Sequence, residues 1–410
     1  MVRPSLLLLH RYAGLTIALF LIISGLTGSL LAFHDEIDEW LNEDWFQIER
    51  TSTTTPLPLN KLTEIVAIQF PKQTIQFIGL KRQSHQSVVM RLTAPDPKDN
   101  SDYVDQIFVN PYTGQILGAR QMGAFDLSKR GVMPFLFKFH YTLHLPDKWG
   151  RWLMGGIALV WLLDCFVGFY LTLPKQTLMN GIRKFQSRWA PAWKIKWGAG
   201  ASRVNYDAHR ASGLWLWGVL FVIAFTSVYL NLNKEIYRPI AGLFTSFTTH
   251  PSEALPKIKS SKPPMDWESA LARGLQLQPT GAEDLPATYI SYLSKQNVFR
   301  MSYDEREANA WFKYKREQIF FDANTGELKA VYGHSNGTSG DRFNSWQFPL
   351  HTGQMFGLFG RILVLITGLV VAGLSITGVY IWYRKSRRHL TFRPLSSDRQ
   401  LTKEPHLFHE

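Results

Sequence analysis

Apolar residues in this chain gather in four long runs, and polar stretches separate them. The runs cover Leu6–Phe33, Trp152–Leu173, Leu214–Leu232 and Leu358–Trp382. An α-helix crosses the hydrocarbon core of a bilayer with about 20 apolar residues, because each residue adds about 1.5 Å. The pattern therefore predicts an integral membrane α-helical protein with four transmembrane helices.

The first run has an alternative interpretation as a cleaved signal peptide, because Arg3 supplies a positive charge ahead of it. Its apolar stretch is longer than a signal peptide uses, and no small-x-small cleavage site precedes His34. We expect it to remain as a membrane anchor.

The two long polar stretches share one pattern. Each opens with a helical segment, continues with two strand-like runs and ends in a hairpin, whose turn reads NPYTG in the first stretch and DANTG in the second. Asn, Asp and Gly suit the positive backbone angles of such turns. Both stretches are long enough to fold as small α+β domains, with one helix against an antiparallel sheet.

Self-similarity organises the chain. The hexapeptide His10–Leu15 (HRYAGL) recurs 199 positions later as His209–Leu214 (HRASGL), and Gln106–Gly114 recurs 212 positions later in the second hairpin. Leu143-His144 recurs 207 positions later as Leu350-His351. We interpret the chain as a tandem duplication of a helix, an outer domain and a second helix.

These observations predict eight segments. They are transmembrane helix 1 (1–33), outer domain 1 (34–139), an outer histidine segment with transmembrane helix 2 (140–174), a basic loop (175–208), transmembrane helix 3 (209–232), outer domain 2 (233–345), a second outer histidine segment with transmembrane helix 4 (346–384), and a tail (385–410).

The net charge of +13 lies mainly in the basic loop and the tail, which with Arg3 fall on one side of a four-helix topology. Such clustering follows the positive-inside rule and does not suggest nucleic acid binding. It predicts cytoplasmic termini and two periplasmic domains, in the inner membrane of a bacterium. The single cysteine, Cys165, excludes an intrachain disulfide.

Histidines mark both membrane faces. His10 and His209 occupy equivalent repeat positions at the inner ends of two helices. Two imidazoles facing each other suit bis-histidine haem ligation, whereas zinc or copper would need three or four clustered ligands. Gly14 and Gly213, one turn along, would let a flat macrocycle approach the backbone or would serve helix packing equally well.

The outer face offers several candidates. His144 and His351 match through the repeat and are the first choice for a second haem, while His140, one turn before His144, could replace or assist it. His34 lies 24 residues after His10, about 36 Å along a helix. It therefore cannot share a cofactor with His10, and it has no repeat counterpart.

Other polar residues adjoin these histidines. Arg11, Arg210, Arg151 and Arg361 could pair with haem propionates or simply be flanking charges. Asp164, in the second apolar run, could relay protons, bind a quinol headgroup, or be a protonated acid bonded to a neighbouring helix. The run Trp311–Arg316 could contact a ligand or form an exposed strand face.

Several motifs are absent from the sequence. There is no GxGxxG after a strand, no P-loop, no CxxC and no HExxH. The basic loop is too short for a flavin or nicotinamide domain. Electrons would therefore come from membrane quinol or from a separate cytoplasmic reductase.

The quoted motifs carry a family resemblance. The HRxxGL opening, the SGLTG run at Ser24–Gly28, the following FHDEID, the TG hairpins and the LHTG before the last apolar run resemble the PepSY-associated transmembrane family. That family includes bacterial inner-membrane ferrisiderophore reductases, such as the ferrioxamine B reductase. The resemblance implies periplasmic PepSY domains, b-type haem in the membrane and reduction of an iron chelate.

Our leading hypothesis is a di-haem electron conduit, an oxidoreductase that reduces a periplasmic ferric siderophore. His10 and His209 would hold one haem, and His144 with His351 the other, with His140 or His34 as substitutes. One alternative is a haem-free scaffold whose outer domains bind a periplasmic protein. Another is a haem conduit serving a different periplasmic acceptor.

Overall fold

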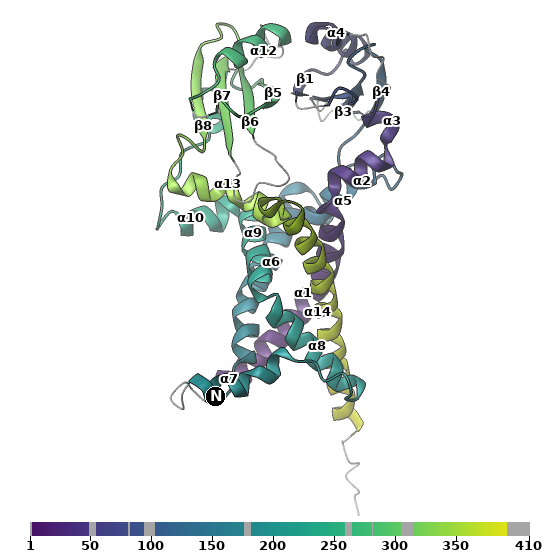
Figure 1. The fold of residues 1–410 in the computed structure, drawn as a ribbon, viewed down its shortest axis with the longest axis vertical. Coiled ribbons are helices and arrows are strands. Elements are labelled where there is room, and N and C mark those ends of the chain that lie inside the picture. The colour runs from purple at the N-terminus through teal and green to yellow at the C-terminus, as the bar shows by residue number, and fades with distance from the viewer. Residues whose placement is uncertain are drawn as a thin grey trace, which may run out of the picture.

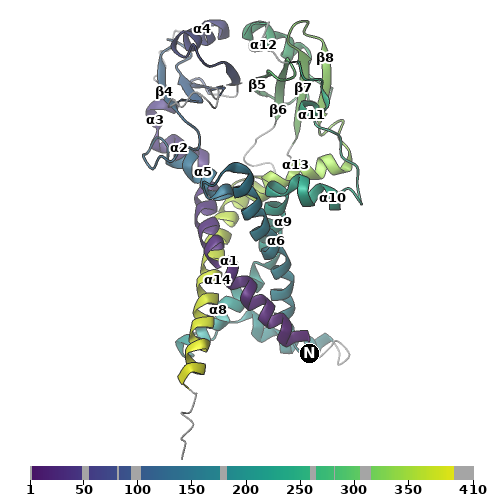
Figure 2. The same ribbon diagram turned by 180° about the vertical axis from the view of Figure 1, so that it is seen from behind.

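The protein consists of a helical bundle joined at one end to a head built around a β-sheet (Figure 1 and Figure 2). The computed structural model describes residues 2–48, 55–80, 83–93, 103–175, 182–258, 265–280, 282–304 and 315–391, without the side chains of 388–391. Residues 311–314 of the aromatic and basic run Trp311–Arg316 lie outside the described residues.

Among the described residues, three single helices are each long and apolar enough to cross a membrane: α1 (Val2–Leu31), α6 (Asp147–Thr172) and α14 (Gly357–Thr391). The third predicted span, 209–232, is not one straight helix. It includes the end of α8 (Ala201–Trp215) and all of α9 (Trp217–Asn231), and these two helices are bent by 68° at Leu216. Hydropathy predicted the apolar content of this segment but not its break, because a window average is insensitive to direction.

The bend changes where His209 lies. His209 lies in the middle of α8, which begins at Ala201, well before the apolar run, and not at the start of a straight transmembrane helix. Helix α8 packs against α14, whereas α9 packs mainly against α6. The bent pair therefore reaches both sides of the bundle.

Helices α1 and α14 approach each other closely at a pair of glycines. A Cβ atom on Gly25 would lie within 2.4 Å of the carbonyl oxygen of Gly368, and the same clash would occur in reverse. Ser29 Oγ also donates to the carbonyl of Leu365 across this contact, at 2.8 Å. Gly25 belongs to the SGLTG run, so part of that motif serves helix packing.

Short helices lie between the bundle and the sheet, where α5 and α13 cross the top of the bundle (Figure 1). The shorter helices of the part of the chain that the structure describes are α2 (His34–Leu41), α3 (Glu43–Phe46), α4 (Leu59–Gln69), α5 (Val132–Thr142), α7 (Ile182–Trp189), η2 (Ala190–Trp193), η3 (Asn233–Tyr237), α10 (Arg238–Ala241), α11 (Pro251–Ala254), α12 (Trp267–Gln276), α13 (Ser339–Thr352) and η4 (Gln354–Phe356). Helix α7, in the basic loop, lies at the far end of the bundle, where α1 begins.

The head contains one eight-stranded antiparallel sheet in the order β4-β3-β2-β1-β5-β6-β7-β8. The strands are β1 (Ile75–Gly79), β2 (Val88–Leu92), β3 (Gln106–Val109), β4 (Ile116–Arg120), β5 (Ala287–Leu293), β6 (Val298–Asp304), β7 (Arg316–Asp322) and β8 (Leu328–Gly333). Each predicted outer domain supplies four consecutive strands.

The two stretches predicted as small α+β domains join edge to edge in this one sheet. Strand β1 pairs with β5, with Ile78 opposite Ile290. Both isoleucines are fully buried in a single hydrophobic core, which α4 and α12 cover. Pairing satisfies the backbone groups that each half would otherwise expose on an edge strand.

Helices α4 and α12 also cap each other. Asn60 Nδ2 donates to Asp266 at 2.7 Å, and the backbone N–H of Glu268 donates to Asn60 Oδ1 at 3.0 Å. The backbone N–H of Leu59 donates to the Glu268 carboxylate at 2.6 Å. These bonds satisfy N-terminal donors of one helix with side chains of the other, so the halves of the head are held together beyond the sheet.

Candidate functional site

Two pairs of histidines face each other at different levels of the molecule. The inner pair is His10 on α1 and His209 on α8, with ring centroids 6.2 Å apart and ring planes inclined at 62°. The outer pair is His140 on α5 and His351 on α13, with centroids 6.3 Å apart and planes inclined at 60°. Nearly the same geometry is thus built twice from different helices.

Each of the four imidazoles makes a hydrogen bond through Nδ1. His10 Nδ1 lies 2.9 Å from the Asp164 carboxylate of α6, and His209 Nδ1 lies 3.0 Å from Thr377 Oγ1 of α14. In the outer pair, His140 Nδ1 lies 2.9 Å from Thr27 Oγ1 of α1, and His351 Nδ1 lies 2.9 Å from Thr226 Oγ1 of α9. A fixed Nδ1 leaves Nε2 as the nitrogen for a metal, which is how protein partners usually orient metal-binding histidines.

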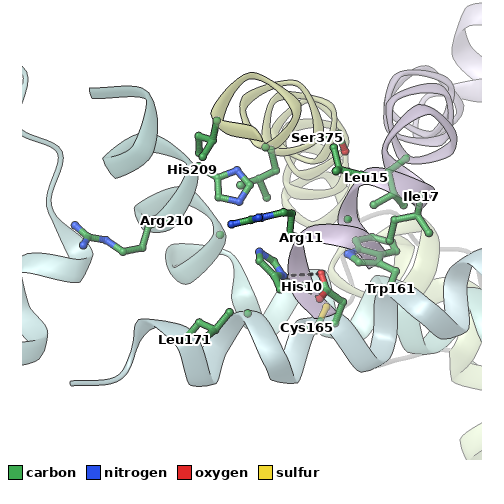
Figure 3. Close-up of a pocket in the computed structure, with 18 of the residues that line it drawn as sticks. His10, Arg11, Leu15, Ile17, Trp161, Cys165, Leu171, His209, Arg210 and Ser375 are labelled. Carbon is green, nitrogen blue, oxygen red and sulfur yellow. Dashed lines mark hydrogen bonds and ion pairs between the residues drawn. The ribbon is translucent and has the colours of Figure 1, made fainter. Parts of the chain in front are cut away.

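The inner pair borders a cavity of about 270 Å³ (Figure 3). Its wall is largely apolar and includes Trp161, Cys165 and four glycines: Gly14, Gly168, Gly213 and Gly378. A Cβ atom on Gly14 would meet no atom within 4 Å. Gly14 is therefore not at a tight contact between the described helices, and its missing side chain leaves space in the cavity.

The two arginines beside the inner pair differ. Both line the cavity, but Arg210 points away from the imidazoles while Arg11 extends toward them (Figure 3). Arg210 donates to the Asp207 carboxylate at 2.9 Å and to the carbonyl of Pro191 at 2.7 Å. Of the two, Arg11 is better placed to meet an anionic group in the cavity.

The outer pair lies about 26 Å from the inner pair along α1, since 17 residues separate His10 from Thr27. A Cβ atom on Gly28 would lie 3.0 Å from His140 Cε1, so a glycine here accommodates the ring. Burial lowers the pKa of His140 to about 4 and that of His351 to about 3. Both are therefore neutral at pH 7, in the form that binds metals.

His144, the preferred partner of His351 from the sequence, does not face it. His144 follows the end of α5 with φ of 60°, and its ring packs on Phe135 and Phe125 at centroid distances of 5.1 and 5.8 Å. The alternative, His140, occupies the place opposite His351. The match of Leu143-His144 with Leu350-His351 had paired His351 with a histidine four residues after the correct one, His140.

His34 and the outer arginines have other partners. His34 begins α2, where Nδ1 lies 2.9 Å from Asp35 and the ring packs on Phe137. Arg361 donates to Glu36 at 2.6 Å and to the carbonyl of Ala32 at 2.8 Å. Arg151 is exposed and donates to the carbonyl of Asp147. With these contacts, His34 is not part of the outer pair, and both arginines are bonded to protein groups.

The spacing of both pairs fits one metal ion between two imidazoles. With a metal–nitrogen bond of about 2.0 Å and a ring centre about 1.1 Å further on, two imidazoles that bind the same ion can have centroids up to about 6.2 Å apart. The observed values are 6.2 and 6.3 Å. Within the described residues, no group of three or more His, Cys, Asp or Glu is placed to hold a metal. The donor sets would thus suit a group held by two histidines better than a zinc ion, which takes four ligands.

Comparison with known families bears on the whole bundle and head. The family described as "PepSY-associated TM region" matches residues 7–385. The chain belongs to this family. The match begins before His10 and extends past Thr377, so both histidine pairs of this PepSY-associated TM protein lie within it. No curated protein is significantly similar to the chain in sequence.

Sequence reasoning missed the threonines of this PepSY-associated TM protein. Thr27 and Thr226 lie 199 positions apart, the same interval as His10 and His209, so the repeat contained this signal. His140 and His351 lie 211 positions apart, close to the 212 of the hairpins. Thr377 carried no comparable signal, because its residue type is ordinary in an apolar helix.

Proposed function

We propose that this protein is a di-haem electron conduit of the bacterial inner membrane that reduces a ferric siderophore on its periplasmic side. His10 and His209 hold one haem, and His140 and His351 hold the other. A haem with two histidine ligands supplies one-electron redox chemistry without an open position for substrate.

One observation carries the proposal: the two histidine pairs have centroid separations of 6.2 and 6.3 Å, each with Nδ1 already bonded. An ionisable side chain within a membrane-spanning segment is costly and usually functional, which supports a ligand role for the inner pair. The glycines at the cavity wall support a flat, bulky occupant at the inner pair.

The protein residues have defined roles in this proposal. The histidines bind the iron, Asp164 and the three threonines fix the orientation of the imidazoles, and the apolar cavity wall excludes water. Arg11 lies where it can pair with a propionate of the inner haem. The bundle holds the two sites at a fixed separation.

Orientation follows from charge. The start of α1, the basic loop with α7 and the end of α14 lie at one end of the bundle (Figure 1), and their lysines and arginines favour the cytoplasmic side. Electrons would then enter at the inner pair, from membrane quinol or a separate cytoplasmic reductase. They would leave at the outer pair, below the periplasmic head.

The proposed substrate rests on the family resemblance and on iron chemistry. Hard oxygen ligands bind Fe(III) much more tightly than Fe(II). A single electron delivered to a ferric siderophore would therefore release the iron for uptake. The head above the outer pair is the part of the protein that such a chelate would contact.

We also propose that the fold arose by duplication and consists of two PepSY-like halves. Each half contributes four antiparallel strands in the same order, and β1 and β5 meet with Ile78 opposite Ile290, 212 positions apart. The matching intervals of His10 with His209 and Thr27 with Thr226 support the same origin.

The deciding experiment is a visible spectrum of the purified full-length protein, expressed with adequate haem, before and after dithionite. We expect a Soret band that shifts on reduction and a haem content near two per chain. His10→Ala should remove the inner haem and leave the outer one. A spectrum without a Soret band would contradict the proposal and favour the haem-free scaffold.

The acceptor is tested separately. The dithionite-reduced protein, freed of excess reductant, is mixed with a ferric siderophore such as ferrioxamine B under anaerobic conditions. Reoxidation of the haem together with appearance of Fe(II) supports the assigned substrate. Haem that stays reduced would retain the conduit and assign it to another periplasmic acceptor.

A further inference from the structure

The four paired histidines differ in the chemical nature of the group on Nδ1. His140, His209 and His351 each face a threonine hydroxyl. His10 alone faces a carboxylate, with both oxygens of Asp164 at 2.9 Å from Nδ1. The inner site therefore has one anionic partner, and the outer site has none among these bonds.

The carboxylate is enclosed. The Asp164 side chain is only 11% exposed, and it lies on α6 inside the apolar bundle. Charges interact more strongly in such surroundings than in water. A carboxylate that accepts from Nδ1–H also makes the imidazole a stronger donor to a metal at Nε2.

Both effects favour the more positive oxidation state of a metal on His10. Ferric iron carries one more positive charge than ferrous iron, so a nearby anion and a more basic ligand stabilise the ferric form. A threonine hydroxyl carries no net charge and has a smaller effect. Stabilising the ferric form lowers the reduction potential.

Two arginines, Arg11 and Arg210, also line the inner cavity and could offset the charge of Asp164. Arg210 lines the same cavity but is paired with the fully buried carboxylate of Asp207 and points away from the imidazoles. Arg11 extends toward the imidazoles and would act in the opposite sense to Asp164. The direct contact at 2.9 Å makes Asp164 the dominant neighbour of His10.

We propose that Asp164 is a positioning residue that makes the inner haem the lower-potential member of the pair, so that electron transfer from the inner to the outer site is downhill. This inference rests on the proposed di-haem function. It concerns the transfer of one electron: the inner iron would be oxidised from Fe(II) to Fe(III) as the outer iron is reduced from Fe(III) to Fe(II), and no bond forms or breaks.

The test is a potentiometric titration of the full-length protein, followed in the visible region. We expect two midpoints, and Asp164→Asn should raise the lower one while the higher one stays unchanged. A tenfold change in the ratio of ferric to ferrous iron corresponds to about 59 mV for this one-electron couple, and we expect a shift of about this size. Asp164→Glu, which keeps the charge, should stay close to the original value.

A matched control replaces a neutral partner. Thr226→Val removes the hydroxyl from His351 and should move only the outer midpoint, by less than Asp164→Asn moves the inner one. Single-haem variants assign the midpoints: His140→Ala retains the inner haem, and His10→Ala retains the outer one.

Failure of this inference is distinct from failure of the proposed function. A protein without haem would refute both. A di-haem protein whose inner midpoint does not change in Asp164→Asn, or whose inner haem has the higher potential in the single-haem variants, would refute only the role of Asp164. The second criterion applies even if Asp164→Asn does not retain its inner haem.

Discussion

The inner and outer histidine pairs reach the same geometry by different means. The inner pair comes from two helices of the bundle, α1 and α8, and borders a cavity lined by glycines. The outer pair comes from two short helices, α5 and α13, that lie across the top of the bundle. Their centroid separations differ by only 0.1 Å, from 6.2 to 6.3 Å.

The difference shows which features the spacing depends on. The two pairs stand on different helices, but every imidazole is bonded at Nδ1 to a side chain of a neighbouring bundle helix. The bundle therefore orients all four rings, including the two on the short helices. This is the role expected of outer-shell partners at metal sites.

The largest expected effect is on haem content and distinguishes the roles of His140 and His144. His140→Ala should abolish the outer haem and halve the haem content, because His140 would be a ligand of that haem in the proposed conduit. His144→Ala should keep both haems, because His144 packs on Phe135 and Phe125 instead. Haem-to-protein ratios from absorbance measure both. Loss of a haem in His144→Ala alone would reverse the assignment.

An intermediate effect is expected at the glycines. Gly14→Leu should place a side chain in the inner cavity and reduce the haem bound there, while the helices still pack, because a Cβ at Gly14 meets no atom within 4 Å. Gly28→Leu should instead displace His140 and weaken only the outer site, since its Cβ would lie 3.0 Å from the ring.

The control for the glycines is Gly156→Leu. Gly156 also has open space around its Cβ position, but it does not line the inner cavity. Its spectrum should match that of the unaltered protein. Equal haem loss in Gly14→Leu and Gly156→Leu would indicate a general packing defect rather than a filled site.

The smallest expected effect concerns Arg361. Its hydrogen bond to Glu36 holds the pKa of that carboxyl below its usual value of 4.5. A lowered pKa in the folded state stabilises the protein above pH 4.5, and this contribution is lost as the pH falls further. Because Glu36 is half exposed, we expect Glu36→Gln to cost less than about 1 kcal/mol at pH 7.

Thermal unfolding at pH 7 and at about pH 3.5 measures this contribution. The difference between Glu36→Gln and the unaltered protein should shrink at the lower pH. A haem spectrum that changes in Arg361→Gln but not in Glu36→Gln would show that Arg361 serves the outer haem instead of the ion pair.

Much of the fold was predictable from the order of apolar and polar residues. Hydropathy identified α1, α6 and α14 as spans, and the turn motifs identified the hairpins β3–β4 and β7–β8. The bend at Leu216 and the joining of the two halves through β1 and β5 were not predicted. Both depend on contacts between segments far apart in the chain.

The candidate site likewise contains residues whose pairing was predicted from the sequence and residues whose pairing was not. His10 and His209 were predicted as a pair because each lies in a repeated hexapeptide, and the structure brings them together. The sequence favoured His144 over His140 through the match of Leu143-His144 with Leu350-His351. A match of two residues is too short to define the register of the repeat, and the preference was wrong. The partner of Asp164 could not be predicted, since 154 residues separate it from His10.

The sequence by itself determined that the chain is a multi-pass membrane protein of the PepSY-associated TM family, with histidines near both ends of its apolar helices. These properties depend on residue type and local order, which need no knowledge of contacts. Only the tertiary structure decided that His140 faces His351 and that Asp164 faces His10. Such pairings depend on how helices cross and rotate, and a shift of one turn along a helix replaces one neighbour with another.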